Sequence, residues 1–291
     1  MTSTVVTPGS DPAAPADRPA HRRPLTARPS RRGGVSLPRA VLAEWTKFRS
    51  LRSTWAVLAL VVVLSLGVGA AIAAAISDPS QPPPRGGPAA GGLTDPVAAV
   101  LAGTSLAALA LGVLGALTAS GEYATGSMAA TLMAVPRRWP VLVAKAALLV
   151  GVVAPFALGM SVGALWLGSL VLGDAATIRW SDSSTIGALL GTTGYLTAVA
   201  LLGLALAVLL RSSAGSITLL VAVVFVLPVL LPLISWDWVQ TAADHLPGSA
   251  GQSLQATATA TLSDAAATWT LLAWTLVPLA GSAVVLQRRD A

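Results

Sequence analysis

The sequence contains no cysteine, only two histidines and little charge, and each shortage excludes a class of protein. Without cysteine, the chain forms no disulfide and offers neither a thiolate metal ligand nor a thiol nucleophile. His21 and His245 fall in a polar N-terminal tail and in a predicted loop, so no apolar segment supplies a histidine for a serine hydrolase or a metal centre. The sequence therefore predicts no catalytic residues and no metal site.

Lysine is also scarce, and this bears on ATP hydrolysis. A P-loop needs the pattern G-x-x-x-x-G-K-[ST], whose lysine and amides hold the phosphates. The chain has only Lys47 and Lys145, which are followed by Phe48 and Ala146, so neither fits the pattern. We therefore predict that this chain is not an enzyme and does not hydrolyse ATP itself.

Apolar residues, in contrast, make up 54% of the 291 residues, and only 10% are charged. Soluble domains carry about 25% charge, so the composition indicates an integral membrane protein. Crossing a hydrocarbon core of about 30 Å takes about 20 apolar residues in a helix. Six segments within 55–291 are long enough, and we predict an all-α fold with transmembrane helices at about 55–76, 97–119, 141–172, 186–210, 216–234 and 267–286.

The distribution of charge predicts how these helices are oriented. With the N-terminus inside, sixteen of the eighteen Lys and Arg residues fall on the inner side, and only Arg85 and Arg179 fall outside. Cytoplasmic loops are the ones enriched in Lys and Arg. We therefore predict a multi-pass plasma membrane protein with both termini in the cytoplasm. Because topology accounts for the net charge of +6, we expect no nucleic-acid partner.

Two segments precede the first predicted span. Residues 1–36 are rich in Pro, Ser, Thr and Arg, and we predict a disordered cytoplasmic tail. Residues 37–54 repeat apolar residues at three- and four-residue steps, with basic residues elsewhere, which is typical of an interfacial amphipathic helix on the lipid bilayer. A plain basic flank of the first span is the alternative. The residues assigned to this helix are Trp45, Lys47, Phe48, Arg49 and Arg52.

The segment 120–145, between the second and third spans, holds more charge than any other internal segment: Glu122, Arg137, Arg138 and Lys145. An acid in mid-span costs roughly 2.5–3.5 kcal/mol, so we expect Glu122 to lie hydrated at a membrane face. Residues 125–135 suit a short amphipathic helix, which Pro136 and Pro140 separate from the third span. The segment is either a docking element for a partner or a positive loop that sets topology.

Four further features concern the spans and their outer connection. Prolines inside the third, fifth and sixth spans predict kinks, and the G-x-x-x-G pairs at 159/163 and 187/191 predict tight helix packing. The outer connection 235–268 suits either short helices that dip toward the membrane or a flexible loop. No ionisable residue is expected deep in a span, which disfavours a proton-coupled carrier.

Three stretches together resemble the permease subunits of type 2 ABC transporters, which are mostly exporters. They are AEWTKFRSLRSTW at 43–55, GEYATGSMAATLMAVPRRWPVLVAKA at 121–146 and LPGSAGQSL at 246–254. The resemblance implies a half-transporter whose ATPase is a separate chain that binds ATP and Mg²⁺. It also implies a second permease subunit, identical or different. The first cytoplasmic connection resembles the coupling helix of the family, with Glu122 and Tyr123 matching its start and Arg137 and Arg138 its basic end.

Two other functions remain open from the residues alone. A membrane scaffold or immunity-type protein would need only the six helices and a positive loop. A small secondary carrier is disfavoured by the missing charge in mid-span. The sequence identifies no substrate-binding residue.

Overall fold

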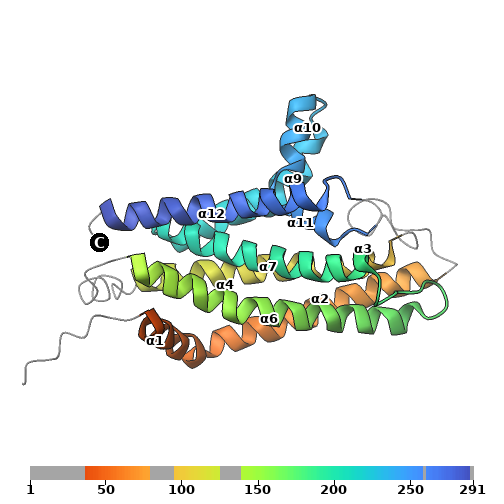
Figure 1. Ribbon diagram of the computed structural model, residues 1–291, viewed down its shortest axis with the longest axis horizontal. Coiled ribbons are helices and arrows are strands. Elements are labelled where there is room, and N and C mark those ends of the chain that lie inside the picture. Colours follow the sequence, from red (N-terminus) through yellow and green to blue (C-terminus); the bar gives the residue numbers. More distant parts are fainter. Residues whose placement is uncertain (1–36, 79–94, 125–138, 258–259, 289–291) are drawn as a thin grey trace, which may run out of the picture. The chain divides into compact units, whose positions relative to one another are not determined.

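The computed structural model describes residues 37–78, 95–124, 139–257 and 260–288, and within these ranges the chain forms helices and no strand (Figure 1). The predicted tail 1–36 lies outside the described residues. So do the central part of the charged segment, 125–138, and with it Arg137 and Arg138.

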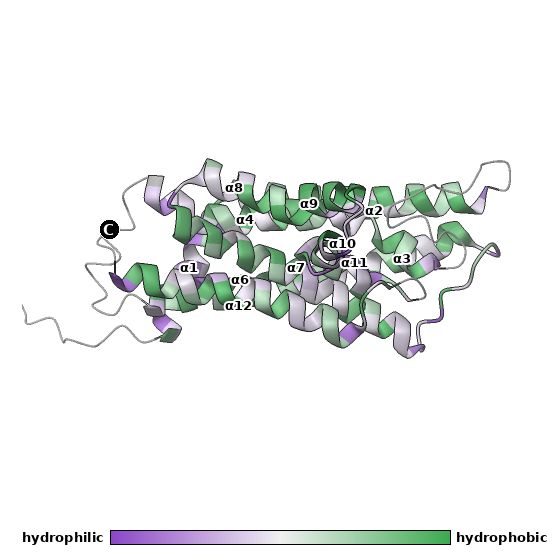
Figure 2. Ribbon diagram, turned by 90° about the horizontal axis from the view of Figure 1, so that it is seen from above, coloured by the Kyte–Doolittle hydropathy of each residue, from purple (hydrophilic) through white to green (hydrophobic). Residues whose placement is uncertain are grey.

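Six helical segments are long and apolar enough to cross a membrane, which confirms the predicted fold class. Figure 2 shows hydrophobic residues along these segments and hydrophilic residues gathered toward the ends. The six are α2 (Arg52–Ser77), α4 (Thr104–Ala124), α6 (Trp139–Leu172), α7 (Ser183–Leu210), the run from α8 (Ser213–Val221) through η3 (Leu231–Leu233), and α12 (Asp264–Arg288).

The second predicted span differs from the structure because the chain breaks within it. A short buried helix, α3 (Pro96–Leu101), precedes α4, and the Asp95 carboxylate accepts a hydrogen bond from the Ala98 backbone N–H at its start. The break includes Gly103, where an added Cβ would overlap the Ser65 carbonyl oxygen of α2. The chain therefore forms α3 and α4 in place of the single helix predicted over 97–119, and the α2 backbone lies close to the break.

The core of the bundle is the contact between α4 and α7. A Cβ at Gly115 of α4 would overlap the Ala200 carbonyl oxygen, and one at Gly203 of α7 would overlap the Gly112 carbonyl oxygen. These glycines therefore allow the two helices to approach closely. The G-x-x-x-G pairs in the sequence do not mark this contact. A Cβ at Gly159 or at Gly187 would meet no atom within 4 Å, but one at Gly191 would overlap the Leu254 carbonyl oxygen of α11, so the tight packing predicted for these pairs is found at Gly191.

The fifth span is irregular, as its prolines predict. A π-helical turn, η2 (Ala222–Val226), is followed by α9 (Leu227–Leu230) and the 3₁₀ turn η3. Pro228 lacks the N–H that an α-helix would need at that position, and its ring would clash with the carbonyl four residues earlier. Pro155 and Pro278, in contrast, lie inside helices that continue past them.

The connection 235–268, which the sequence predicts to be outside, forms two short helices and is not a flexible loop throughout. Helix α10 (Asp237–Asp244) stands away from the bundle in Figure 1. Helix α11 (Pro247–Gln255) is largely buried, because it packs against α7, α12 and the π-helical turn. Residues 258–259, within this connection, lie outside the described residues.

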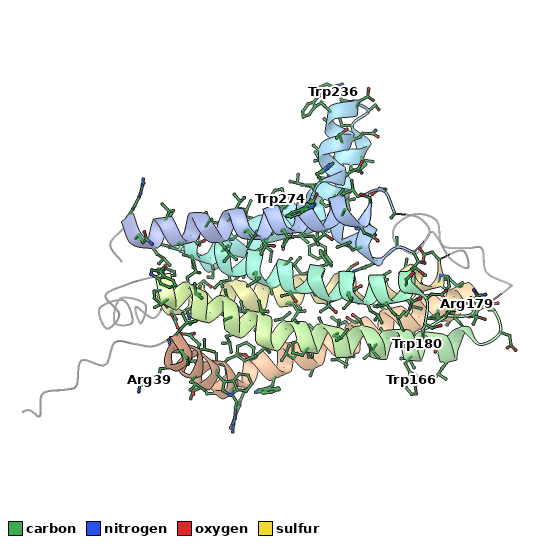
Figure 3. All side chains as sticks on the ribbon, viewed as in Figure 1. Arg39, Trp166, Arg179, Trp180, Trp236 and Trp274 are labelled. Atoms are coloured by element: carbon green, nitrogen blue, oxygen red, sulfur yellow. The ribbon has the colours of Figure 1, made fainter. Side chains whose placement is uncertain are left out.

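The two ends of the bundle differ, and one of them carries α1 (Leu37–Ser50). Figure 3 shows Arg39 at this end and Arg179 with Trp180 at the other. The last turn of α12 lies at the same end as α1 (Figure 1). We call this end the α1 end. Helix α1 stops at Ser50, short of the predicted 37–54, because Leu51 is extended and α2 starts at Arg52.

Candidate functional site

Four charged side chains from three helices meet at the α1 end. They are Glu44 and Lys47 of α1, Glu122 of α4 and Lys145 of α6, and we call them the inner ion-pair cluster. Glu44 and Phe48 are the buried residues of α1. Residues four apart lie on one face of a helix, so α1 presents an acid and an aromatic ring to the bundle together.

Lys145 is the centre of the cluster, and its side chain is only 2% exposed. Its Nζ donates to Glu44 Oε2 and to Glu122 Oε1, both at 2.8 Å, and to the Thr118 carbonyl oxygen at 3.2 Å. An ammonium group has three N–H donors, and each has an acceptor here. A buried charge is tolerated when it is paired and hydrogen-bonded in this way.

Lys47 closes the cluster at its solvent-exposed edge. Its Nζ lies 2.9 Å from Glu122 Oε1 and 3.3 Å from Glu44 Oε1, and its side chain is 49% exposed. Partial burial by itself would lower the pKa of Lys47, but the hydrogen bond to Glu122 and the charges of Glu44 and Glu122 outweigh that effect and raise it above 10.5. With two acids and two bases, the four groups are neutral as a set.

The last turn of α4 has a second anchor next to Glu122. The Arg211 guanidinium carbon lies 5.6 Å from the centre of the Tyr123 ring, within the range of a cation–π contact. Arg211 ends α7 in the left-handed conformation, with φ 51°, directly before α8 begins. Glu122 therefore ties α4 to α1 and α6, and Tyr123 ties it to the junction of α7 and α8.

The cluster joins the two helices on either side of the charged connection. Residues 125–138 leave from α4 just after Glu122 and Tyr123 and enter α6 shortly before Lys145. A displacement of that connection would therefore act on two helices that the cluster joins to each other and to α1. Within the described ranges, no group of three His, Asp or Glu residues is placed to hold a metal ion.

The structure corrects the prediction that Glu122 is hydrated. Its side chain is 13% exposed, because α1 covers this end of α4 and α6 and supplies Lys47 as a partner. Its Oε1 lies 2.8 Å from Lys145 Nζ and 2.9 Å from Lys47 Nζ.

The residues assigned to the interfacial helix differ in burial and in their contacts. Phe48 is buried and stacks with the more exposed Trp45, with ring centres 6.4 Å apart. Lys47 joins the cluster, and Arg49 and Arg52 are exposed.

Sequence reasoning did not assign Glu44 or Lys145 to the site. The sequence could have identified Glu44, because this acid lies three residues after Val41 and four before Phe48, on the apolar face of α1. An acid on an apolar face indicates a buried partner. The partner itself, 101 residues away, could not be identified from spacing.

The comparisons with known proteins give the family. A search of curated proteins found no match. The family described as "ABC-2 family transporter protein" matches residues 41–291, from α1 through all six spans. The match covers the inner ion-pair cluster and the connection that leaves from it. The chain therefore belongs to the ABC-2 family of transporters, as a membrane-embedded transport permease.

Proposed function

We propose that the chain is the permease subunit of an ATP-driven exporter in the plasma membrane. A separate ATPase chain, which binds ATP and Mg²⁺, docks on the segment 120–145, and a second permease subunit completes the transporter. The observation that carries the proposal is the family match together with the inner ion-pair cluster, which anchors both ends of the 125–138 connection. On this proposal the α1 end faces the cytoplasm, and Arg137 and Arg138 contact the ATPase.

The contacts suggest how a pull on the connection spreads. Through Glu122 and Lys145, a displacement of the connection would move α1, α4 and α6. Through Tyr123 and Arg211, it would move the junction of α7 and α8. Helix α8 continues into the π-helical turn. A Cβ at Gly248 of α11 would overlap the Val224 carbonyl oxygen of that turn, so the two segments touch backbone to backbone. Movement of the fifth span would therefore displace α11, which we assign as the outer gate.

Co-purification tests the partner and its docking site. The full chain is tagged at the C-terminus, expressed in its native host, extracted gently, and the proteins that accompany it are identified. We expect a P-loop ATPase with the wild type, and its loss with the double variant Arg137→Ala, Arg138→Ala. Arg179→Ala removes one arginine at the opposite end of the bundle and should retain the ATPase.

Glu122 is left intact in this test because its removal would leave Lys145 with one acid fewer. If the double variant retained the ATPase and its transport-coupled ATP turnover, docking on Arg137 and Arg138 would be wrong. If well-folded wild type brought down no ATPase, a non-transporting scaffold would replace the proposal.

A further inference from the structure

A groove runs along the surface of the bundle between α7 and α12, which lie side by side (Figure 1). Its volume is about 620 Å³, within the range of small-molecule sites. Along α12 its lining extends from Asp264 to Leu276, about 18 Å at 1.5 Å per residue. This length is close to half of a hydrocarbon core of about 30 Å, so the groove suits one alkyl chain. We call it the α7–α12 groove, and residues of α6 and α11 complete its lining.

The α7–α12 groove is open to the surroundings of the bundle. Leu190, Leu272 and Leu276 line it and are exposed. On α7, a Cβ at Gly187 or at Gly194 would meet no atom within 4 Å, so these glycines leave the groove unfilled. A molecule dissolved in the bilayer around the spans can therefore enter it from the side.

The threonines in the lining do not make it polar. The hydroxyls of Thr193, Thr197 and Thr275 each donate to the backbone carbonyl oxygen four residues earlier, at 2.7–2.8 Å. Thr268 donates in the same way to the Asp264 carbonyl oxygen, at 2.7 Å. A hydroxyl has only one hydrogen to donate, and here each one is used within its own helix. The groove therefore accepts an apolar body along most of its length.

Asp264 is the only charged residue that the structure places in the lining. It lies exposed in the first turn of α12, and among the described residues its carboxylate has neither a hydrogen bond nor an ion pair. All other described acids except Glu44 and Glu122 also lie away from the α1 end, where Arg179 is the only described base. Acids that outnumber bases concentrate cations nearby. The groove therefore favours a cationic group at its Asp264 end.

We propose that the α7–α12 groove binds an amphiphile with one cationic group, taken from the bilayer around it. The cation lies at Asp264, and the alkyl chain lies between α7 and α12. A zwitterionic amphiphile would place an anion near Asp264, and a small cation without a chain would leave the apolar lining empty. The inference goes beyond the proposed function. It depends neither on the ATPase nor on whether the bound molecule is exported.

Photolabelling of the full chain in phosphatidylcholine nanodiscs tests the inference. The probe is tetradecyltrimethylammonium with a diazirine in its chain, and peptide mass spectrometry locates the label. We expect the label on α7 and α12 along the groove, and its displacement by unlabelled tetradecyltrimethylammonium. Tetradecylphosphocholine, which adds a phosphate beside the same cation, should displace it less at equal mole fraction in the bilayer. Equal displacement by the two, or a label spread evenly over the spans, would overturn the inference.

Asp264→Asn tests the charge. It should weaken displacement by tetradecyltrimethylammonium about threefold, as expected for the loss of one exposed ion pair. Asp237→Asn is the matched control, because Asp237 is also an exposed acid in the first turn of a helix, α10, and does not line the groove. An unchanged Asp264→Asn variant would overturn the inference. Equal effects of the two variants would do the same, because they would indicate diffuse attraction to an acidic surface.

A second pair of variants tests the alkyl chain without altering charge. Gly194→Leu fills part of the groove without a clash, because a Cβ there meets no atom within 4 Å. Gly151→Leu on α6 is equally unobstructed and does not line the groove. We expect only Gly194→Leu to lose the label on α7 and α12. Wild-type labelling of Gly194→Leu would contradict the inference, and so would displacement by tetramethylammonium, which has no alkyl chain.

Discussion

Lys145 is the largest fully buried side chain among the described residues, and its charge depends on two acids from other helices. Removing one partner of a buried ion pair costs about 3–5 kcal/mol, because the remaining charge is left without compensation. We therefore expect Lys145→Met to destabilise the protein by about that amount, since Glu44 and Glu122 would both lose the buried lysine that they share. Thermal unfolding in detergent measures the change.

The double variant Lys145→Met, Glu122→Gln tests whether charge is the cause. It leaves Glu44 with Lys47, a neutral pair that is already in place at 3.3 Å. We expect it to unfold at a higher temperature than Lys145→Met alone, despite the additional substitution. A double variant that is less stable than the single variant would show that the shape of the lysine matters here, and not the neutrality of the cluster.

The raised pKa of Lys47 predicts how its contribution depends on pH. A base whose pKa is higher in the folded than in the unfolded state stabilises the fold fully below the unfolded value, and this contribution is lost as pH rises through the folded value. Thermal unfolding of wild type and Lys47→Met should therefore differ by a constant amount at pH 8–10. The difference should shrink above the ordinary value of 10.5. A difference that grows above that value would contradict the assignment.

At the scale of helices, we expect a glycine-to-alanine substitution to destabilise the protein inside the α4–α7 contact and not at an unobstructed site on α6. Gly115→Ala would place a methyl group on the Ala200 carbonyl oxygen, which belongs to a helix backbone and has no room to move. We expect a loss of about 1–3 kcal/mol, typical of overpacking. Gly151→Ala meets nothing within 4 Å and should be neutral or stabilising, since alanine favours a helix over glycine. Thermal unfolding of both variants checks this, and equal effects would contradict the contact.

The same helices show which features the sequence predicted. The six spans were predictable because burial in lipid requires about 20 apolar residues wherever the helix packs. The break before α4 was not predicted: residues 97–119 are apolar enough for one helix, and the close approach of the α2 backbone to Gly103 appears only in the folded bundle. Within the candidate site, the sequence assigned Glu122 and Tyr123, because they match the family motif. The three hydrogen bonds of Lys145 arise only after α1, α4 and α6 pack together.

At the scale of the whole described bundle, two sets of contacts lie at different depths. The inner ion-pair cluster joins α1, α4 and α6 at the α1 end. Away from it, the Asp95 carboxylate at the start of α3 accepts hydrogen bonds from the Thr257 backbone N–H at 2.7 Å and its hydroxyl at 2.6 Å, just beyond α11. The proposed coupling between an ATPase at the α1 end and α11 requires that end to face the cytoplasm, because the ATPase needs ATP.

The absence of cysteine makes this orientation directly testable. Ser181→Cys places a thiol at an exposed position between α6 and α7, and Thr46→Cys places one on the exposed face of α1. A membrane-impermeant maleimide added to intact cells should label Ser181→Cys and leave Thr46→Cys unlabelled. Permeabilised cells should show labelling of both variants, and the wild-type chain, which has no thiol, should stay unlabelled in either case. The reverse pattern in intact cells would place the 125–138 connection outside, where no ATP is available to a docked ATPase, and would overturn both the orientation and the proposed coupling.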